Sequence, residues 1–288
     1  MRLGLIILFW FLGGLIGQTQ EAQPSPAPDE TPAKPATYAQ AHVDQPFIAM
    51  TFDDGPSAEN TPRLLEMLKQ RNIKATFFLI GQNAASNPEI VRRILAEGHE
   101  IGNHSWTHPQ LSKLSDERVT TEITKTQEAI KSASGFTPTL LRPPYGAITP
   151  RQRAWIENQF GLNIILWSVD PFDWKRPGAS VITQRILTQV RPGAIILSHD
   201  IHKQTIDAMP ATLDGLIRKG YKFATVSQLI AMNKPKPSPS PVAKSEVGQA
   251  NSPKSAKEGT RASDVHVPGG EHVEETPSPS PASALKLQ

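Results

Sequence analysis

The chain has 288 residues, a formal net charge of +3 and no cysteine. This length suits one large domain or two small ones, and the lack of cysteine excludes disulfides, thiolate metal sites and a lipid-modified N-terminal cysteine. The small net charge, with no basic stripe in the sequence, argues against a nucleic-acid-binding protein.

The first twenty residues differ from the rest of the chain. Arg2 precedes an apolar run, and the stretch from Leu3 to Gly17 is 15 residues long. A basic start before a short apolar stretch is typical of a secretory signal, and this stretch is shorter than the ~20 residues of a membrane span. Residues 1–20 therefore predict an exported protein, with this segment either cleaved as a signal peptide or retained as a membrane anchor.

Two Pro-rich segments flank the middle of the chain. Residues 21–42 and residues 233–288 contain too few apolar side chains to offset the entropy lost on ordering. We expect the first to be a linker and the second a disordered tail, which would serve as a spacer or in attachment to a wall or partner. Residues 43–232 remain as the folded domain.

The middle region alternates short apolar runs with stretches of helical periodicity. The expected strands are Phe47–Phe52, Ala75–Ile80, Glu100–Asn103, Leu140–Arg142, Ile164–Val169, Ala194–Ser198 and Phe223–Val226. The expected helices are Pro62–Gln70, Glu89–Glu97, Asp116–Ser132, Thr149–Gln159, Val181–Val190 and Thr205–Lys219. Such alternation predicts an α/β fold with a parallel sheet covered on its faces. Helix-length crossovers favour a distorted (β/α) barrel of about seven strands over a doubly wound open sheet.

Polar residues follow five of the expected strands directly. They are Asp53-Asp54, His104, Arg142, Asp170 and His199-Asp200. In a parallel barrel the carboxyl ends of the strands open onto one face, where active sites assemble. The sequence therefore predicts an active site at this face.

Asp54, His104 and His108 form a possible metal-binding set. Asp53 and Asp54 precede a Gly55-Pro56 turn, and the two histidines are four residues apart, on a brief helix or in a tight turn. Two imidazoles and one carboxylate suit a divalent metal and leave coordination positions open. A solvated turn and surface histidines are the alternative, and an aspartate at a neighbouring strand end favours the metal site.

Three further strand ends carry residues that could take part in catalysis or substrate binding. Arg142 would either lie on the surface of a rigid loop or turn inward to hold a carboxylate, while backbone N–H groups near Tyr145 could bind an oxyanion. Asp173 could lie beside His199 and raise the pKa of its imidazole.

Apolar side chains accompany these groups. Trp174 and Leu197 could line a small apolar pocket, and His202 would be either a metal ligand or, as we expect, the surface start of a helix.

These motifs resemble those of the polysaccharide deacetylases with a NodB homology domain, carbohydrate esterase family four. The similarity spans roughly Phe47 to Val226 and comprises five motifs in order: Thr51-Phe-Asp-Asp-Gly-Pro56, His104-Ser-Trp-Thr-His108, Arg142-Pro-Pro-Tyr145, Asp170-Pro-Phe-Asp-Trp174 and Leu197-Ser-His199. The family fold is a distorted (β/α) barrel of seven strands, in agreement with the count from periodicity.

The resemblance implies a role for each motif residue. One divalent metal ion would be held by Asp54, His104 and His108. Zinc is the metal we expect first, and cobalt or another transition metal is the alternative. Asp53 would be the general base, with Arg142 as its partner.

By the same resemblance, His199 would be the general acid and Asp173 would tune it. Trp174 and Leu197 would flank the acetyl methyl group, and the backbone amide of Tyr145 would help to bind the oxyanion.

The implied activity is the removal of N-acetyl groups from N-acetylglucosamine units of a polysaccharide. The export leader favours a periplasmic, cell-envelope or secreted location and peptidoglycan as the substrate, with chitin oligomers and acetylated exopolysaccharide as alternatives. A metal amidohydrolase acting on non-sugar amides and an inactive glycan-binding module are the rival interpretations.

Overall fold

The computed structural model describes residues 36–234, and the predicted leader and most of the predicted tail lie outside them. The strands are β1 (Thr37–Tyr38), β2 (Phe47–Asp53), β3 (Thr76–Leu79), β4 (Glu100–Asn103), β5 (Leu140–Leu141), β6 (Asn163–Ile165), β7 (Ile195–Ile196) and β8 (Lys222–Phe223). The helices are α1 (Asn60–Gln70), α2 (Gly81–Ser86), α3 (Pro88–Ala96), α4 (Asp116–Ser134), α5 (Pro150–Phe160), α6 (Ala179–Gln189), α7 (Lys203–Arg218) and α8 (Val226–Ala231). Single 3₁₀ turns cover Leu111–Lys113, Pro144–Gly146 and Asp173–Lys175.

The strands form one curled parallel sheet. Its order is β1-β6-β5-β4-β3-β2-β7, and β8 also pairs with β2. A parallel bridge between Val169, which follows β6, and Ile196 of β7 links the two sides of the curl. The strands β2 to β6 are neighbours in chain order, without the reversal of a doubly wound sheet. The predicted distorted barrel is therefore confirmed.

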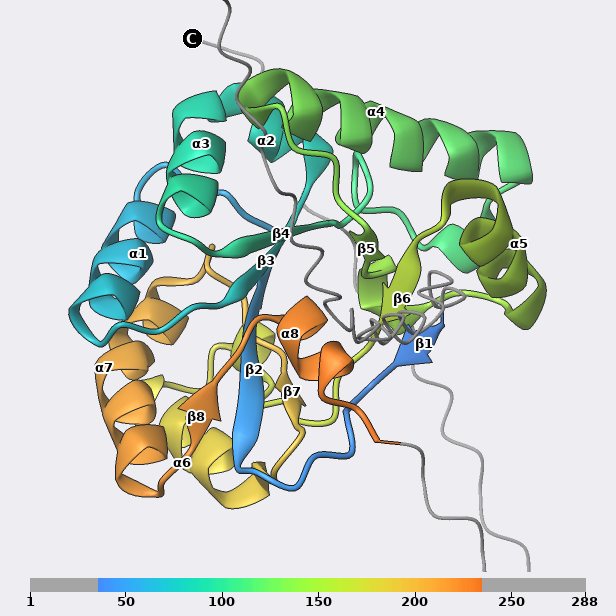
Figure 1. Ribbon diagram of the computed structural model, residues 1–288. Coiled ribbons are helices and arrows are strands. Elements are labelled where there is room, and N and C mark those ends of the chain that lie inside the picture. The colour runs from blue at the N-terminus through green and yellow to red at the C-terminus, as the bar shows by residue number, and fades with distance from the viewer. Residues whose placement is uncertain (1–35, 235–288) are drawn as a thin grey trace, which may run out of the picture. The chain divides into compact units, whose positions relative to one another are not determined.

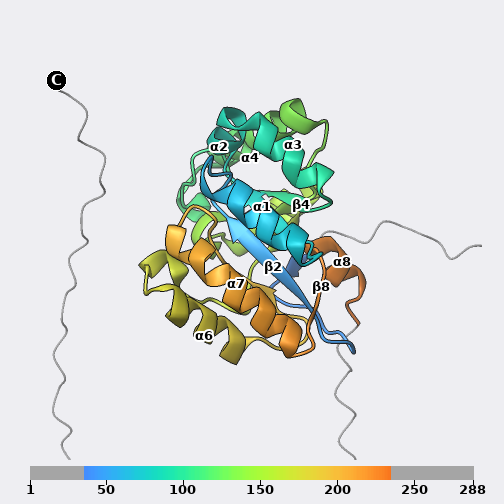
Figure 2. The ribbon, with the colours of Figure 1, turned by 90° about the vertical axis from the view of Figure 1, so that its left-hand side faces the viewer.

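The helices lie around the outside of the curled sheet (Figures 1 and 2). The longer helices pack on it through apolar residues three and four positions apart, such as Leu64, Leu65 and Leu68 of α1, all of which are fully buried. Both sheet faces are covered, so all four residues of β3 are buried. This rigid frame carries the strand-end loops.

All seven expected strands are present, but the sheet has an additional strand, β1. It pairs with β6, and Ile164 N donates to Ala36 O at 3.0 Å. At the other boundary, Lys234 N donates to His42 O at 2.9 Å. The folded region thus begins before the expected boundary at Val43, and residues 36–42 are not part of a linker.

Two helices were not expected from the sequence. The short helix α2 has a largely polar sequence without helical periodicity. The helix α8 begins at Val226, which we expected to end a strand. Thr225 and Gln228 form a capping box there, because Thr225 Oγ1 accepts from Gln228 N and Gln228 Oε1 accepts from Thr225 N at 3.0 Å.

Within residues 36–234, none of the helices has the length and apolar character needed to span a bilayer. The proposed anchor in residues 1–20 lies outside the described residues.

Candidate metal and catalytic site

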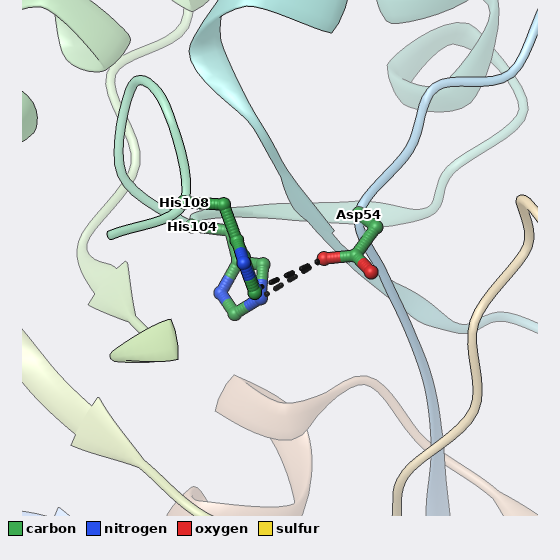
Figure 3. A group of neighbouring side chains, drawn as sticks. All are labelled: Asp54, His104 and His108. Carbon is green, nitrogen blue, oxygen red and sulfur yellow. Dashed lines mark ion pairs between the residues drawn. The ribbon is translucent and has the colours of Figure 1, made fainter. Parts of the chain in front are cut away.

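Three side chains at the carboxyl ends of β2 and β4 converge on one point (Figure 3). Asp54 Oδ1 lies 3.4 Å from His104 Nε2 and 3.3 Å from His108 Nε2. One ligand atom from each residue lies within 4.8 Å of the other two. The predicted Asp54, His104 and His108 set is thus brought together by the fold.

The donor set fits a divalent cation. His104 Nδ1 lies 2.7 Å from the Arg142 carbonyl oxygen. Because that oxygen can only accept, Nδ1 carries the proton, and Nε2 is the ring nitrogen that faces Asp54 and could bind a cation. Asp54 Oδ1 is buried and accepts no hydrogen bond from any described residue. Buried oxygens normally have a partner, so this atom is available as a ligand.

The directions of the pKa shifts of Asp54 and His108 also suit metal binding. Burial would raise the pKa of Asp54, but the adjacent His104 and His108 outweigh burial and hold this pKa well below its usual range. Burial and the neighbouring His104 lower the pKa of His108. An ionised carboxylate and neutral imidazoles are the forms that bind metals.

The turn that carries the histidines is irregular, as the following proline suggested. Ser105 and His108 have positive φ angles of 63° and 60°. Asn103 Oδ1 accepts from Ser105 N at 2.8 Å, and Ser105 Oγ accepts from His108 N at 3.1 Å. These local bonds turn both rings back toward Asp54.

Asp53 is paired with Arg142 beside the metal-binding set. Arg142 Nη1 donates to Asp53 Oδ1 at 2.7 Å, and the exposed fractions of the two residues are 0% and 2%. The guanidinium also donates to Thr51 Oγ1 and to the carbonyls of Ile165 and Leu166. Arg142 therefore turns inward, and its other bonds fix it against Asp53.

His199 is paired with a fully buried carboxylate. Asp173 Oδ1 lies 2.8 Å from His199 Nδ1, and Asp173 Oδ2 accepts from His199 N at 2.8 Å and from Thr205 Oγ1 at 2.7 Å. Burial lowers the pKa of His199, but the hydrogen bond and charge of Asp173, with the charges of Asp53 and Asp54, outweigh burial and raise it to about 9. The ring is therefore protonated at neutral pH.

Asp53 and His199 stand on adjacent strand ends. Asp53 N donates to Ser198 O at 2.9 Å, and a parallel bridge joins residues 53 and 199. A proton acceptor and a proton donor thus face one opening.

That opening is a cavity of about 330 Å³, within the range of small-ligand sites. Its lining comprises Asp53, Asp54, His104, His108, Pro143, Tyr145, Trp167, Asp170, Trp174, Leu197 and His199. Arg142 and Asp173 are fully buried and contact the lining residues from behind. The predicted site residues therefore share one cavity or its immediate support.

Some residues of the cavity were missed. Trp167 fell inside the expected strand Ile164–Val169, but β6 ends at Ile165 and the chain turns, so that Trp167 lines the cavity. Asp170 was noted as a strand-end residue without a role. His202 precedes α7, and its ring centroid lies 6.0 Å from that of His199. It starts a helix, as expected, and is not a member of the metal-binding set.

Comparison with known proteins identifies the family. A family profile described as "Polysaccharide deacetylase" matches residues 40–165. The chain is 43% identical to the peptidoglycan-N-acetylglucosamine deacetylase of Bacillus cereus over 191 residues, which cover 65% of this chain and 69% of that protein. This chain belongs to the polysaccharide deacetylase family.

Other family members show the same similarity. The chain is 47% identical to peptidoglycan-N-acetylglucosamine deacetylase PgdA of Listeria monocytogenes over 182 residues, covering 63% of this chain but only 38% of that protein. Further family members are named chitooligosaccharide deacetylases, such as one from Bradyrhizobium at 39% identity. The crystal structure of the Bc1960 peptidoglycan N-acetylglucosamine deacetylase superposes with a TM-score of 0.65 at 38% identity, covering 70% of this chain and 95% of that one.

Proposed function

We propose that this protein is a metal-dependent hydrolase that removes N-acetyl groups from N-acetylglucosamine units of peptidoglycan. The observation that carries the proposal is the convergence of a buried base, a metal-binding set and a protonated acid on one cavity. The family membership supports the same chemistry.

Asp54, His104 and His108 would hold the metal ion, through one carboxylate oxygen and two Nε2 atoms. Zinc is our first choice, and a His₂Asp set also accepts cobalt and other transition ions. When bound, the ion would supply Lewis-acid polarisation of the amide carbonyl and a more acidic water.

Asp53 would act as the general base. Its carboxylate, which accepts a hydrogen bond from Arg142, takes one proton from water while the water oxygen forms a bond to the amide carbon. The oxyanion that develops lies toward the backbone of Tyr145, and Leu197 and Trp174 enclose the acetyl methyl group.

His199 would act as the general acid. Its Nδ1–H is committed to Asp173, so the proton on Nε2 passes to the sugar nitrogen as the carbon–nitrogen bond breaks. An amine leaves readily only when protonated. The products are acetate and a sugar with a free amino group, and transfer of the proton held by Asp53 to His199 restores both groups to their starting states.

A basic and aromatic ledge supports peptidoglycan over chitin. We give this name to Phe172, Trp174, Lys175 and Arg176, all of which are exposed, while Trp174 also lines the cavity. Lys175 Nζ lies 4.9 Å from the ring centroid of Trp174. Within residues 36–234, neither cation of the ledge forms an ion pair. Peptidoglycan carries carboxylates beside its N-acetyl sugars, and chitin is neutral.

The predicted leader in residues 1–20 and the wall substrates named for the relatives support an exported, cell-envelope location. The segment would act either as a cleaved signal or as an anchor. Both alternatives give the protein access to peptidoglycan.

The deciding experiment measures acetate release by the purified full chain. Peptidoglycan and chitin oligomers are each incubated with the protein, with and without a chelator, and with zinc restored. Release that a chelator abolishes and zinc restores, faster on peptidoglycan, is the expected result. If zinc-loaded protein released acetate from neither glycan, the proposal would be wrong. If it released acetate from chitin alone, peptidoglycan would not be its substrate.

A further inference from the structure

We infer that Glu122 of α4 is a positioning residue for the metal site, because its side chain fixes the turn that carries His104 and His108. The inference rests on the proposed function in one respect, that these two histidines bind a metal ion. Glu122 does not line the cavity, and the five motifs do not include it.

The turn between the histidines has a backbone that needs external support. Ser105 and His108 both have positive φ angles, a conformation that costs free energy for residues other than glycine. Such a conformation persists only where surrounding contacts over-determine it. The contacts of Trp106 and Thr107, which lie between the two histidines, must therefore stabilise this turn.

Glu122 supplies these contacts on one side of the turn. Its Oε2 accepts from Trp106 N and Thr107 N, both at 2.8 Å, and its Oε1 accepts from Thr107 Oγ1 at 2.8 Å. Glu122 is only 5% exposed, and within the described residues it forms no ion pair. Within the described residues, all side-chain hydrogen bonds of Glu122 are thus made to this turn.

The start of α2 holds the opposite side of the same turn. Gly81 N donates to Ser105 O at 2.9 Å, and Gln82 N donates to Trp106 O at 3.2 Å. A Cβ on Gly81 would lie 2.4 Å from Trp106 Cε3, so the two segments are in close contact. The peptide groups between the histidines are therefore held by the Glu122 carboxylate on one side and by the backbone N–H groups of Gly81 and Gln82 on the other.

A carboxylate suits this position best. Three donors converge on Glu122, and a carboxylate only accepts and forms charge-assisted hydrogen bonds. A glutamine could keep its oxygen toward the two N–H groups and turn its NH₂ group toward Thr107 Oγ1, which can also accept, but these hydrogen bonds would be neutral and weaker. Glu122→Gln therefore keeps the shape of the side chain and weakens its hold on the turn.

The test is metal affinity. Apo-protein is titrated with zinc against a chromophoric chelator, and the cobalt-loaded protein is examined by visible absorption. Loss of groups that orient metal ligands typically costs about 10–100-fold in metal affinity. We expect a rise of this size in the zinc Kd of Glu122→Gln and an altered cobalt spectrum. The exposed Glu128 on the same helix supplies the matched control, Glu128→Gln, with both readouts unchanged.

The outcomes separate the inference from the function it rests on. A purely structural role would lower the thermal midpoint of the apo-protein and leave the zinc Kd and cobalt spectrum unchanged, which would overturn the inference. Failure of the wild-type chain to bind zinc would overturn the metal site itself. If Glu122→Gln does not fold, Thr107→Val removes one of the three bonds, and a zinc Kd equal to that of the wild type would also overturn the inference.

Discussion

At the residue scale, Asp53 and Arg142 form a buried ion pair beside the cavity, with Arg142 Nη1 2.7 Å from Asp53 Oδ1. A buried charge is stable only with such a partner. The Asp53–Arg142 pair is therefore expected to affect both proton transfer during catalysis and the stability of the folded protein.

Asp53→Asn is expected to lower kcat for acetate release by about 10²–10⁴-fold, because an amide cannot take the proton of the attacking water. Zinc content, measured in parallel, is expected to stay at the wild-type value since Asp54 and both histidines remain. Full activity of this variant would show that Asp53 is not the base.

Asp173→Asn is expected to move the alkaline limit of activity to lower pH. His199 donates a proton only below its pKa, which Asp173 helps to raise to about 9, so wild-type kcat/KM falls as the pH rises through that region. Without the carboxylate the pKa of His199 falls, and activity is lost at a lower pH. Profiles of kcat/KM against pH measure the shift.

Thr205→Val is the control for the Asp173 variant. It removes one hydrogen bond to Asp173 but retains the carboxylate and its bond to His199, so its alkaline limit is expected to stay near that of the wild type and above that of Asp173→Asn. Identical profiles for all three proteins would contradict the role of His199.

At the scale of elements, β1 stabilises the sheet beside the site. Its two residues pair with β6, Leu166 N donates to Tyr38 O at 2.7 Å, and Ala41 N donates to Gly193 O at 2.9 Å. The carbonyls of residues 165 and 166 in turn accept from Arg142. The strand β1 at the edge of the sheet thus supports Arg142, the hydrogen-bond partner of Asp53.

A chain that begins at residue 43 is expected to be less stable than one that begins at residue 36. Each lost hydrogen bond contributes about 1 kcal/mol, and several are lost with residues 36–42. Thermal unfolding of the two chains measures the difference. Equal midpoints would show that β1 contributes nothing and would restore the boundary at Val43.

The strands were largely predictable because they are buried on both faces and therefore have continuous apolar sequences. The polar residues that follow them marked the strand ends. The strand β1 was not predictable, since two residues within a Pro-rich stretch carry no periodicity. Glu122 was also missed. A single acidic residue on a helix shows no sign in the sequence that its partners lie 15 and 16 positions away.

The convergence of Asp54, His104 and His108 was predictable from residue types, because the fold requires strand-end residues to meet at one face. Trp167 was not, since it depended on where β6 ends. The inward turn of Arg142 depended on the acceptors of other strands, which only the assembled fold provides.

At the scale of the whole molecule, the ledge predicts selectivity by charge. Each exposed ion pair contributes about 0.2–1 kcal/mol, so Lys175→Gln/Arg176→Gln is expected to lower kcat/KM on carboxylate-bearing glycan strands by roughly 2- to 30-fold. Activity on neutral chitin oligomers is expected to change little. Steady-state kinetics on both substrates measure the ratio.

The control Lys69→Gln/Lys131→Gln removes the same charge from exposed positions outside the cavity lining and is expected to leave that ratio unchanged. An equal loss on both glycans in the ledge variant would point to the catalytic step and not to recognition of carboxylates.

The strand β2 pairs with three others, β3, β7 and β8, and it ends in Asp53. Its amides are therefore expected to exchange with solvent only when the whole domain opens. Loops at the rim of the sheet are expected to open locally more often than this central strand. The two adjacent carboxylates, Asp53 and Asp54, would therefore keep their positions while the surrounding loops adapt to a bulky polymer.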